Sequence, residues 1–193
     1  MSEGGYKIRN QAAVHFITFA TVVPIAIGRI DVFTRKAYRD IVLESIEHCQ
    51  ENKGLILHAW CITSNHLHLI VAAKEDLSDI LRDFKKFTSK QIIKAIQENE
   101  HESRKEWMLS LFKQAGEKNS RNSEYLPIAI GIWRQDNQPK ELYSSAFVYQ
   151  KLNYIHNNPI EAGIVEKPEE YLYSSAKDYK QIKKCGLLDV VFI

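Results

Sequence analysis

Residues 60–71 read Trp-Cys-Ile-Thr-Ser-Asn-His-Leu-His-Leu-Ile-Val, and this run is the strongest indication of the fold. Two mainly apolar stretches flank Ser64 and Asn65, a pattern typical of two antiparallel strands joined by a tight turn. Side chains two residues apart in a strand point to the same face, so His66 and His68 should project side by side. The run therefore predicts a β-hairpin that presents two imidazoles on one face of a sheet.

The rest of the chain supplies a strand before this hairpin and helices around it. Apolar periodicity, capping residues and turn residues predict a strand at 14–22, a helix capped by Thr34 and ended near Gly54, strands at 55–63 and 66–73, a helix at 78–97, a strand at 126–134, a turn at 135–139 and a helix at 141–158. Asn157 and Asn158 should end the last helix because Pro159 follows them.

This order of elements predicts an α+β fold, a ferredoxin-like split βαβ antiparallel sheet with helices on one face and an added C-terminal helix. The length of 193 residues fits a single domain over 1–193. Within it, the polar stretch at about 98–125 is expected to be an excursion or a flexible loop, and a tail begins at about 159. The other face of such a sheet is open to a metal and a substrate.

The composition excludes several classes of protein. A formal net charge of +2 is too small to imply a polyanionic partner by itself, so any nucleic-acid surface must be local. Cys49, Cys61 and Cys185 form no CxxC pair, which argues against a zinc knuckle or a disulfide framework. Residues 12–27 lack the pattern of a signal peptide or a membrane span. We expect a soluble protein in a reducing, cytoplasmic compartment.

The paired histidines point to a divalent metal site. Two imidazoles at this spacing fill two coordination positions and leave others open, as catalysis at a phosphate requires. Asn158 is the candidate third ligand, because it follows Tyr154 by one helical turn and carries a hard amide oxygen. Such a mixed set favours Mg²⁺ or Mn²⁺ over a closed zinc site.

Tyr154 is the candidate nucleophile. A phenol with a reference pKa of about 10 attacks a phosphodiester only when the phosphate is activated, and a bound metal supplies that activation. The product would be a 5′-phosphotyrosine and a free 3′-hydroxyl. Because the covalent link keeps a phosphodiester, a 3′-hydroxyl can attack it in turn and rejoin strands without ATP.

Single-stranded or locally unpaired DNA suits a small open sheet face. Basic residues that could follow its phosphates recur along the predicted helix at 78–97, and two more lie elsewhere near the proposed site: Arg82, Lys85, Lys86, Lys90 and Lys94, with Arg134 and Lys151. Taken alone, such a stripe is most often a solvated helix face. Trp60 and Trp133 are expected in the core rather than as stacking platforms, and His156 is expected to be structural.

Two motifs in this order resemble a known family. Residues 60–71 are similar to the HUH motif of the Y1 tyrosine transposases of the IS200/IS605 type, and residues 153–165 resemble the REP-associated tyrosine transposase branch. The resemblance covers most of the chain apart from residues 98–125. Ser64 departs from the pattern, because relatives commonly have proline there, and the polar excursion is long for a minimal enzyme.

The resemblance implies a Mg²⁺- or Mn²⁺-dependent nuclease and strand transferase that acts on single-stranded DNA near imperfect hairpins. Tyr154 would be the nucleophile, His66 and His68 the metal ligands, and Asn158 aligns with a polar ligand on the tyrosine helix. Both a monomer and a homodimer occur among such enzymes. Two alternatives stay open: a metal-dependent phosphodiesterase that uses water, and a non-catalytic nucleic-acid-binding protein of the same fold.

Overall fold

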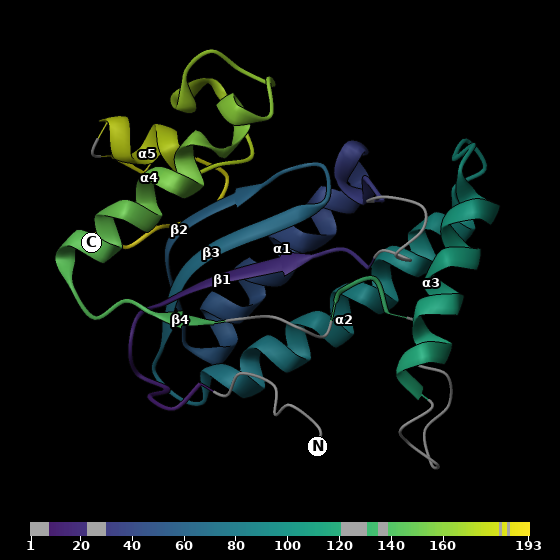
Figure 1. Cartoon of the computed structure of the whole chain (residues 1–193), viewed down its shortest axis with the longest axis horizontal. Helices are drawn as coiled ribbons and strands as arrows, with labels where there is room; N and C mark the ends of the chain where they lie inside the picture. Colours follow the sequence, from purple (N-terminus) through teal and green to yellow (C-terminus); the bar gives the residue numbers. More distant parts are fainter. Residues whose placement is uncertain (1–7, 23–29, 121–130, 135–138, 182, 185) are drawn as a thin grey trace.

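The computed structural model describes residues 8–22, 30–120, 131–134, 139–181, 183–184 and 186–193. The elements in this part of the chain, in order, are β1 (His15–Ala20), η1 (Val32–Thr34), α1 (Lys36–Lys53), β2 (Leu55–Ile62), β3 (His66–Ala73), α2 (Leu77–Glu98), α3 (Lys105–Ser120), β4 (Lys140–Glu141), α4 (Ser145–Glu161), η2 (Pro168–Glu170) and α5 (Ala176–Gln181) (Figure 1). No described helix is long and apolar enough to cross a membrane.

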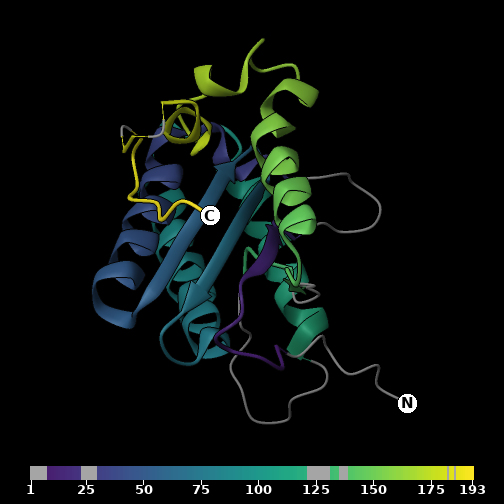
Figure 2. The same ribbon diagram turned by 90° about the vertical axis from the view of Figure 1, so that its left-hand side faces the viewer.

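The four strands form one antiparallel sheet in the order β2-β3-β1-β4. Helices α1 and α2 lie on one side of this sheet and α4 lies on the other (Figure 2). Strand alternation divides the core accordingly: Ile17 and Leu67 belong to the large cluster beneath α1 and α2, whereas Phe16 and Ile70 belong to a smaller cluster beneath α4. The predicted α+β fold with an antiparallel sheet is confirmed.

The hairpin and the first helix form largely as the sequence predicts. The β2–β3 turn at Ser64 and Asn65 is closed by a hydrogen bond from the Thr63 amide to the His66 carbonyl at 2.9 Å. Helix α1 ends at Gly54, whose φ of 68° is accessible to glycine at little cost. Its predicted cap is wrong: Thr34 belongs to η1, and α1 begins at Lys36 without a side-chain cap.

Residues 105–120 form helix α3, so the expectation of a flexible loop is wrong for this part of the polar excursion. Met108, Leu111 and Phe112 are buried against the large core cluster. These three apolar residues share one helix face, and their burial stabilises a segment whose remaining composition is polar.

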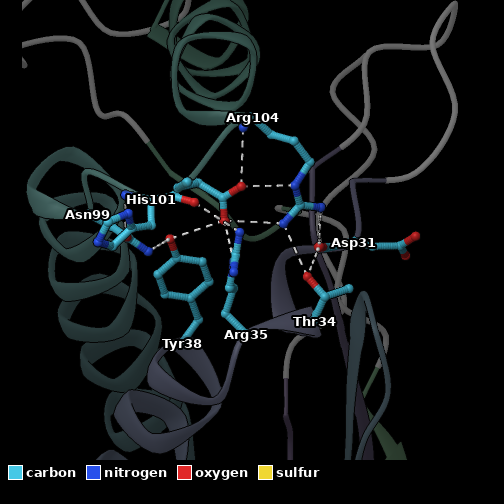
Figure 3. A network of polar contacts seen from close by, with 8 residues as sticks. Asp31, Thr34, Arg35, Tyr38, Asn99, His101 and Arg104 are labelled. Atoms are coloured by element: carbon cyan, nitrogen blue, oxygen red, sulfur yellow. Dashed lines mark hydrogen bonds and ion pairs between the residues drawn. The ribbon is translucent and has the colours of Figure 1, made fainter.

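A buried carboxylate fixes the connection between α2 and α3 (Figure 3). Glu102 is only 3% exposed, and each of its oxygens lies 3.1 Å from an arginine Nε, that of Arg35 or that of Arg104. Burial alone would raise the pKa of Glu102, but the hydrogen bonds and charges of the two arginines outweigh it and lower this pKa to about 2. Arg104 also donates to the Asp31 carbonyl at 3.1 Å, which ties the connection to the loop before α1.

Glu102 should make the free energy of unfolding depend on acid pH. Its folded-state pKa of about 2 lies below the ordinary value of 4.5, so the carboxylate stabilises the fold above pH 4.5 and this contribution is lost as the pH falls toward 2. E102Q should lower the free energy of unfolding at pH 7 by up to roughly 3 kcal/mol. Urea titrations at several pH values measure this, with the exposed Glu98 (E98Q) as the matched control. An equal stability of E102Q and wild type at pH 7 contradicts the expectation.

The fourth strand differs from the prediction. Residues 126–130 of the predicted strand and 135–138 of the predicted turn lie outside the described residues. Residues 131–134 form only an isolated bridge, from Trp133 to Thr21, and the sheet instead gains the two-residue β4 paired with His15 and Phe16. Trp133 is buried, and its indole donates to Thr88 Oγ1 at 2.8 Å, which confirms its place in the core.

Helix α4 is displaced from its predicted bounds at both ends. Ser144 caps it by accepting from the Phe147 amide at 3.3 Å, so it begins at Ser145 rather than at Glu141. It also continues through Pro159 to Glu161, and the expectation that Asn157 and Asn158 end it is wrong. Proline in the last turn lacks a backbone N–H donor. The turn is nevertheless held by the burial of Pro159 and by backbone hydrogen bonds from the residues after it.

The tail after α4 lies along β2, the outer strand of the sheet opposite β4. The Ile62 amide donates to Tyr173 O at 2.9 Å, the Ser175 amide to Trp60 O at 3.0 Å, and the Val191 amide to Leu57 O at 2.8 Å. These bonds satisfy the backbone groups of an edge strand and cover it. Beneath the tail, the fully buried Trp60 confirms the prediction that this residue packs in the core.

Candidate active site

The two histidines of β3 lie side by side, as predicted. Their ring centroids are 5.7 Å apart and the ring planes differ by 2°. Strand β1 adds two neighbours on the same face, because Thr18 pairs with His68 in the register and Phe16 lies two residues before it. The Phe16 ring stacks on His68 at a centroid distance of 6.1 Å, and Thr18 Oγ1 lies 3.0 Å from His68 Nδ1.

Helix α4 brings Tyr154 to this pair within a single chain. The Tyr154 ring meets the His68 ring edge-on at 5.5 Å and the Phe16 ring at 5.8 Å. Leu152 and Ile155 of the same helix are buried against the sheet and fix its position. Tyr154 remains 42% exposed, so a phenol beside the histidines is open to a substrate.

A chain of hydrogen bonds orients His66. The Nδ1 atom of His66 bonds to the amide oxygen of Asn65, and the Asn65 amide nitrogen donates to Asp31 Oδ1 at 2.7 Å. Ser64 Oγ donates to the same Asp31 oxygen at 2.7 Å. An amide oxygen only accepts, so Nδ1 carries a proton, and in the neutral ring the lone pair is then on Nε2. This is the tautomer that binds a metal through Nε2.

His68 is held in the neutral form. It is 3% exposed, and burial, followed by the nearby His66, lowers the pKa of its imidazole to about 3. Its Nδ1 lies 3.0 Å from Thr18 Oγ1, a hydroxyl that can donate or accept, and the lone pair of the ring is on Nε2 in the tautomer in which Nδ1 donates. The two imidazoles are therefore suited to bind the same cation.

Asn158 lies one turn after Tyr154 and is partly buried. Its Nδ2 donates to the Tyr154 carbonyl at 3.3 Å, so its amide oxygen is the atom it can offer to a cation. Within the described residues, no group of three or more His, Cys, Asp or Glu side chains forms a complete metal cage. Two imidazoles side by side would fill two positions of a divalent cation and leave the others open.

Lys151 places a positive charge beside the phenol. Its Nζ lies 5.4 Å from the Tyr154 ring centroid, 5.0 Å from that of Phe16 and 5.6 Å from that of Phe147. Burial among these rings, followed by the charge of Lys140, lowers the pKa of Lys151. The sequence places Lys151 near the proposed site, and the structure puts its ammonium group next to the candidate nucleophile.

The basic residues of α2 do not join this cluster, because α2 covers the opposite side of the sheet (Figure 2). Arg82 pairs with Asp79 and Asp83, and Lys94 pairs with Glu98. Two others, Lys86 and Lys90, line a cavity of about 480 Å³ between α1 and α2.

The backbone of Arg134 joins the end of β1 to Lys85 of α2. The Arg134 amide donates at 2.9 Å to the carbonyl of Ala20, the residue paired with His66 across β1 and β3. Lys85 donates to the Arg134 carbonyl at 2.7 Å. The backbone of Arg134 is therefore close in register to the histidine strand, at the end of β1.

Sequence reasoning misses four residues of this site. Phe16 and Thr18 alternate with core residues in the predicted first strand, which indicates their shared face, but their contact with His68 requires the strand pairing. Asn65 adjoins His66, and the sequence assigns it only to the turn. Asp31 carries no sequence signal, because a loop residue reaches the hairpin only in the folded chain. His156 is buried and bonds to Ser175 Oγ at 3.0 Å, in agreement with a structural role.

Comparisons with known proteins show the family to which this chain belongs. The profile of a family described as "Transposase IS200 like" matches residues 14–122, which is more than half of the chain. The chain belongs to this family of IS200-like transposases, which are DNA-processing enzymes and in general depend on a metal. The matched range includes the histidine strand and ends before α4.

A solved structure extends the likeness to the whole chain. It is described as "Structure of the REP associates tyrosine transposase bound to a REP hairpin". The match has a TM-score of 0.56 and 15% sequence identity, and it covers 100% of this chain and 95% of that chain. At this identity the likeness establishes the fold, including the region of α4. Among curated proteins, none matches the chain.

Proposed function

We propose that this transposase cleaves and rejoins single-stranded DNA through a 5′-phosphotyrosine on Tyr154, with Mg²⁺ or Mn²⁺ held by His66, His68 and Asn158. One observation carries the proposal: an exposed phenol lies against the buried, neutral imidazole of His68, whose ring lies parallel to that of His66. When bound, a divalent cation supplies a Lewis acid that draws charge from the non-bridging oxygens of the phosphate.

Tyr154 and Lys151 have different roles in the proposed cleavage step. The phenolic oxygen of Tyr154 attacks phosphorus, the P–Oη bond forms and the bond from phosphorus to the 3′ oxygen breaks. The exposed phenol gives its proton to solvent, and the departing oxygen takes one from solvent to become a 3′-hydroxyl. The Lys151 ammonium, beside the Tyr154 ring, is placed to hold the negative phosphate during this exchange.

Rejoining runs the same exchange backwards. A 3′-hydroxyl attacks the phosphotyrosine, a new phosphodiester forms and Tyr154 leaves with its proton restored. The number of phosphate ester bonds is unchanged in each step, so the reaction needs no nucleotide cofactor. Tyr154 and His68 meet within one chain, which supports a monomer as the active form.

The proposed substrate is single-stranded DNA next to a hairpin. This fits the family and the similar solved structure, in which a REP-associated tyrosine transposase is bound to a REP hairpin. Lys151 and Arg134 are proposed to contact the cleaved strand. Helix α2 lies across the sheet from Tyr154, so its basic residues are proposed to contact DNA that extends beyond the cleaved strand. These residues are Arg82, Lys85, Lys86, Lys90 and Lys94.

A labelling experiment tests the proposal. DNA hairpins with single-stranded flanks and a 3′ label are incubated with the protein and Mn²⁺ and separated on a denaturing gel. The labelled fragment should migrate with the protein as a covalent adduct. Free cleaved product without an adduct indicates a hydrolase that uses water, and intact DNA that remains bound indicates a non-catalytic binding protein. Either result overturns the phosphotyrosine reaction.

Asn65 should be required for metal binding although it is not a ligand. N65A removes the acceptor that fixes the proton on His66 Nδ1, and loss of such an outer partner typically weakens metal affinity by 10- to 100-fold. Titration calorimetry with Mn²⁺ measures the affinity, and ¹⁵N NMR of the imidazole reports the tautomer. Asn52, whose amide contacts His48 on α1, provides a matched control variant, N52A. Unchanged affinity and tautomer in N65A would exclude the role.

A further inference from the structure

A row of aromatic and cationic side chains leads away from Tyr154 toward the start of α4. The Tyr143 and Phe147 ring centroids are 5.4 Å apart, and Lys151 Nζ lies 5.6 Å from the Phe147 ring and 5.4 Å from the Tyr154 ring. Spacings of four and three residues place Phe147, Lys151 and Tyr154 on one face of α4, and Tyr143, which precedes the Ser144 cap, contacts Phe147 at the start of this face. We call this row, Tyr143, Phe147 and Lys151, the α4 track.

The outer end of the track is exposed but fixed in position. Tyr143 is 82% exposed, the highest value among the large hydrophobic side chains described. Its neighbours anchor it on both sides: Leu142 is buried and its amide donates to Val14 O at 2.8 Å, while Ser144 caps α4. Ordered backbone on both sides therefore holds the Tyr143 ring in solvent, and the ring is not part of the hydrophobic core.

The track also carries positive charge on the same face as the active site. Lys140 pairs with Phe16 in the register of β4 and β1, so its side chain shares the Phe16 face, whereas Glu141 alternates to the other face. The charge of Lys140 reaches Lys151 and contributes to lowering its pKa, after burial. Two ammonium groups therefore flank the aromatic rings near Tyr154.

We propose that the α4 track binds the unpaired nucleotides next to the scissile phosphate. A base stacks on Tyr143 and Phe147, and phosphates lie at Lys151 and Lys140. Aromatic rings beside cations are the features that hold single strands without regard to sequence, since every base has a stacking face. From Phe147 to Tyr154 the helix rises about 10 Å, a distance that a few nucleotides span. The inference rests on the proposed function, which supplies the occupant.

Fluorescence of a stacked base tests the α4 track without cleavage. Y154F, which cannot form the phosphotyrosine, is titrated with DNA hairpins whose single-stranded flanks carry 2-aminopurine at one position on either side of the hairpin. Stacking should quench the probe in at least one flank. Adding Y143A should weaken binding about tenfold and restore fluorescence. Y143W should retain both properties, and Y149A, an exposed tyrosine on another face of α4, should change neither.

The outcomes separate the track from the reaction. Equal affinity and quenching with and without Y143A overturn the track, and covalent adducts formed by protein with Tyr154 intact would still support the reaction. Quenching that depends on Tyr143, with no adduct formed by Tyr154, supports the track as a binding surface and overturns the reaction. An equal loss of DNA binding in Y149A also overturns the track, because it shows that binding does not depend on which face of α4 is altered.

Discussion

Y154F is expected to remove the covalent DNA adduct completely and to reduce cleavage on the order of 10⁴-fold or more, as loss of a catalytic nucleophile does in other enzymes. Phenylalanine keeps the edge contacts to His68 and Phe16 and lacks only the oxygen that attacks phosphorus. Because the side chain is 42% exposed, the free energy of unfolding should change by less than about 1 kcal/mol. Affinity for uncleaved hairpin DNA should remain close to that of wild type.

The control for this prediction lies on the same helix. Tyr149 is 66% exposed, more than Tyr154, and it lies on another face of α4, so Y149F should form the adduct at the wild-type rate. Gel assays with 3′-labelled DNA measure both variants, and mass spectrometry of the digested adduct identifies the modified residue. A nucleotide on any tyrosine other than Tyr154, or an adduct that persists in Y154F, contradicts the assignment.

Most of the fold could be predicted from local patterns. Two mainly apolar stretches around the Ser64-Asn65 turn define the hairpin, a spacing of two residues puts His66 and His68 on one face, and Gly54 ends α1 where the helical pattern stops. The failures have physical causes as well. Strand β4 has two residues, too few for any periodicity, and among the described side chains of α3 the apolar ones that bury it are Met108, Leu111 and Phe112, within a polar segment.

The site is predictable only in its parts. The sequence indicates that Tyr154 and Asn158 share a helix face, but helix periodicity does not say which side of the sheet a helix covers. For the same reason the sequence does not reveal that the basic stripe of α2 packs on the side of the sheet away from the site. The hydrogen bond between Asn65 and Asp31 joins residues 34 positions apart, and no local sequence pattern predicts it.

H68A should abolish metal binding at the site and cleavage with it. His68 is buried between Phe16, Thr18 and Tyr154, and alanine removes one of two imidazoles from a site that has few other ligands. We expect the affinity for Mn²⁺ to fall at least about 100-fold, since loss of even an outer partner costs 10- to 100-fold. Titration calorimetry measures the binding, and the labelled-DNA assay measures the cleavage.

Two further variants keep this prediction testable if the cavity left by alanine destabilises the fold. H68Q fills most of the space and replaces the imidazole by an amide, so it should stay folded and still bind Mn²⁺ weakly. H48A removes an exposed histidine on α1, on the other side of the sheet, and should bind and cleave as wild type does. Circular dichroism establishes which variants are folded. Folded H68Q with wild-type Mn²⁺ affinity would show that the cation is bound elsewhere, and Tyr154 would then lack the activation on which its attack depends.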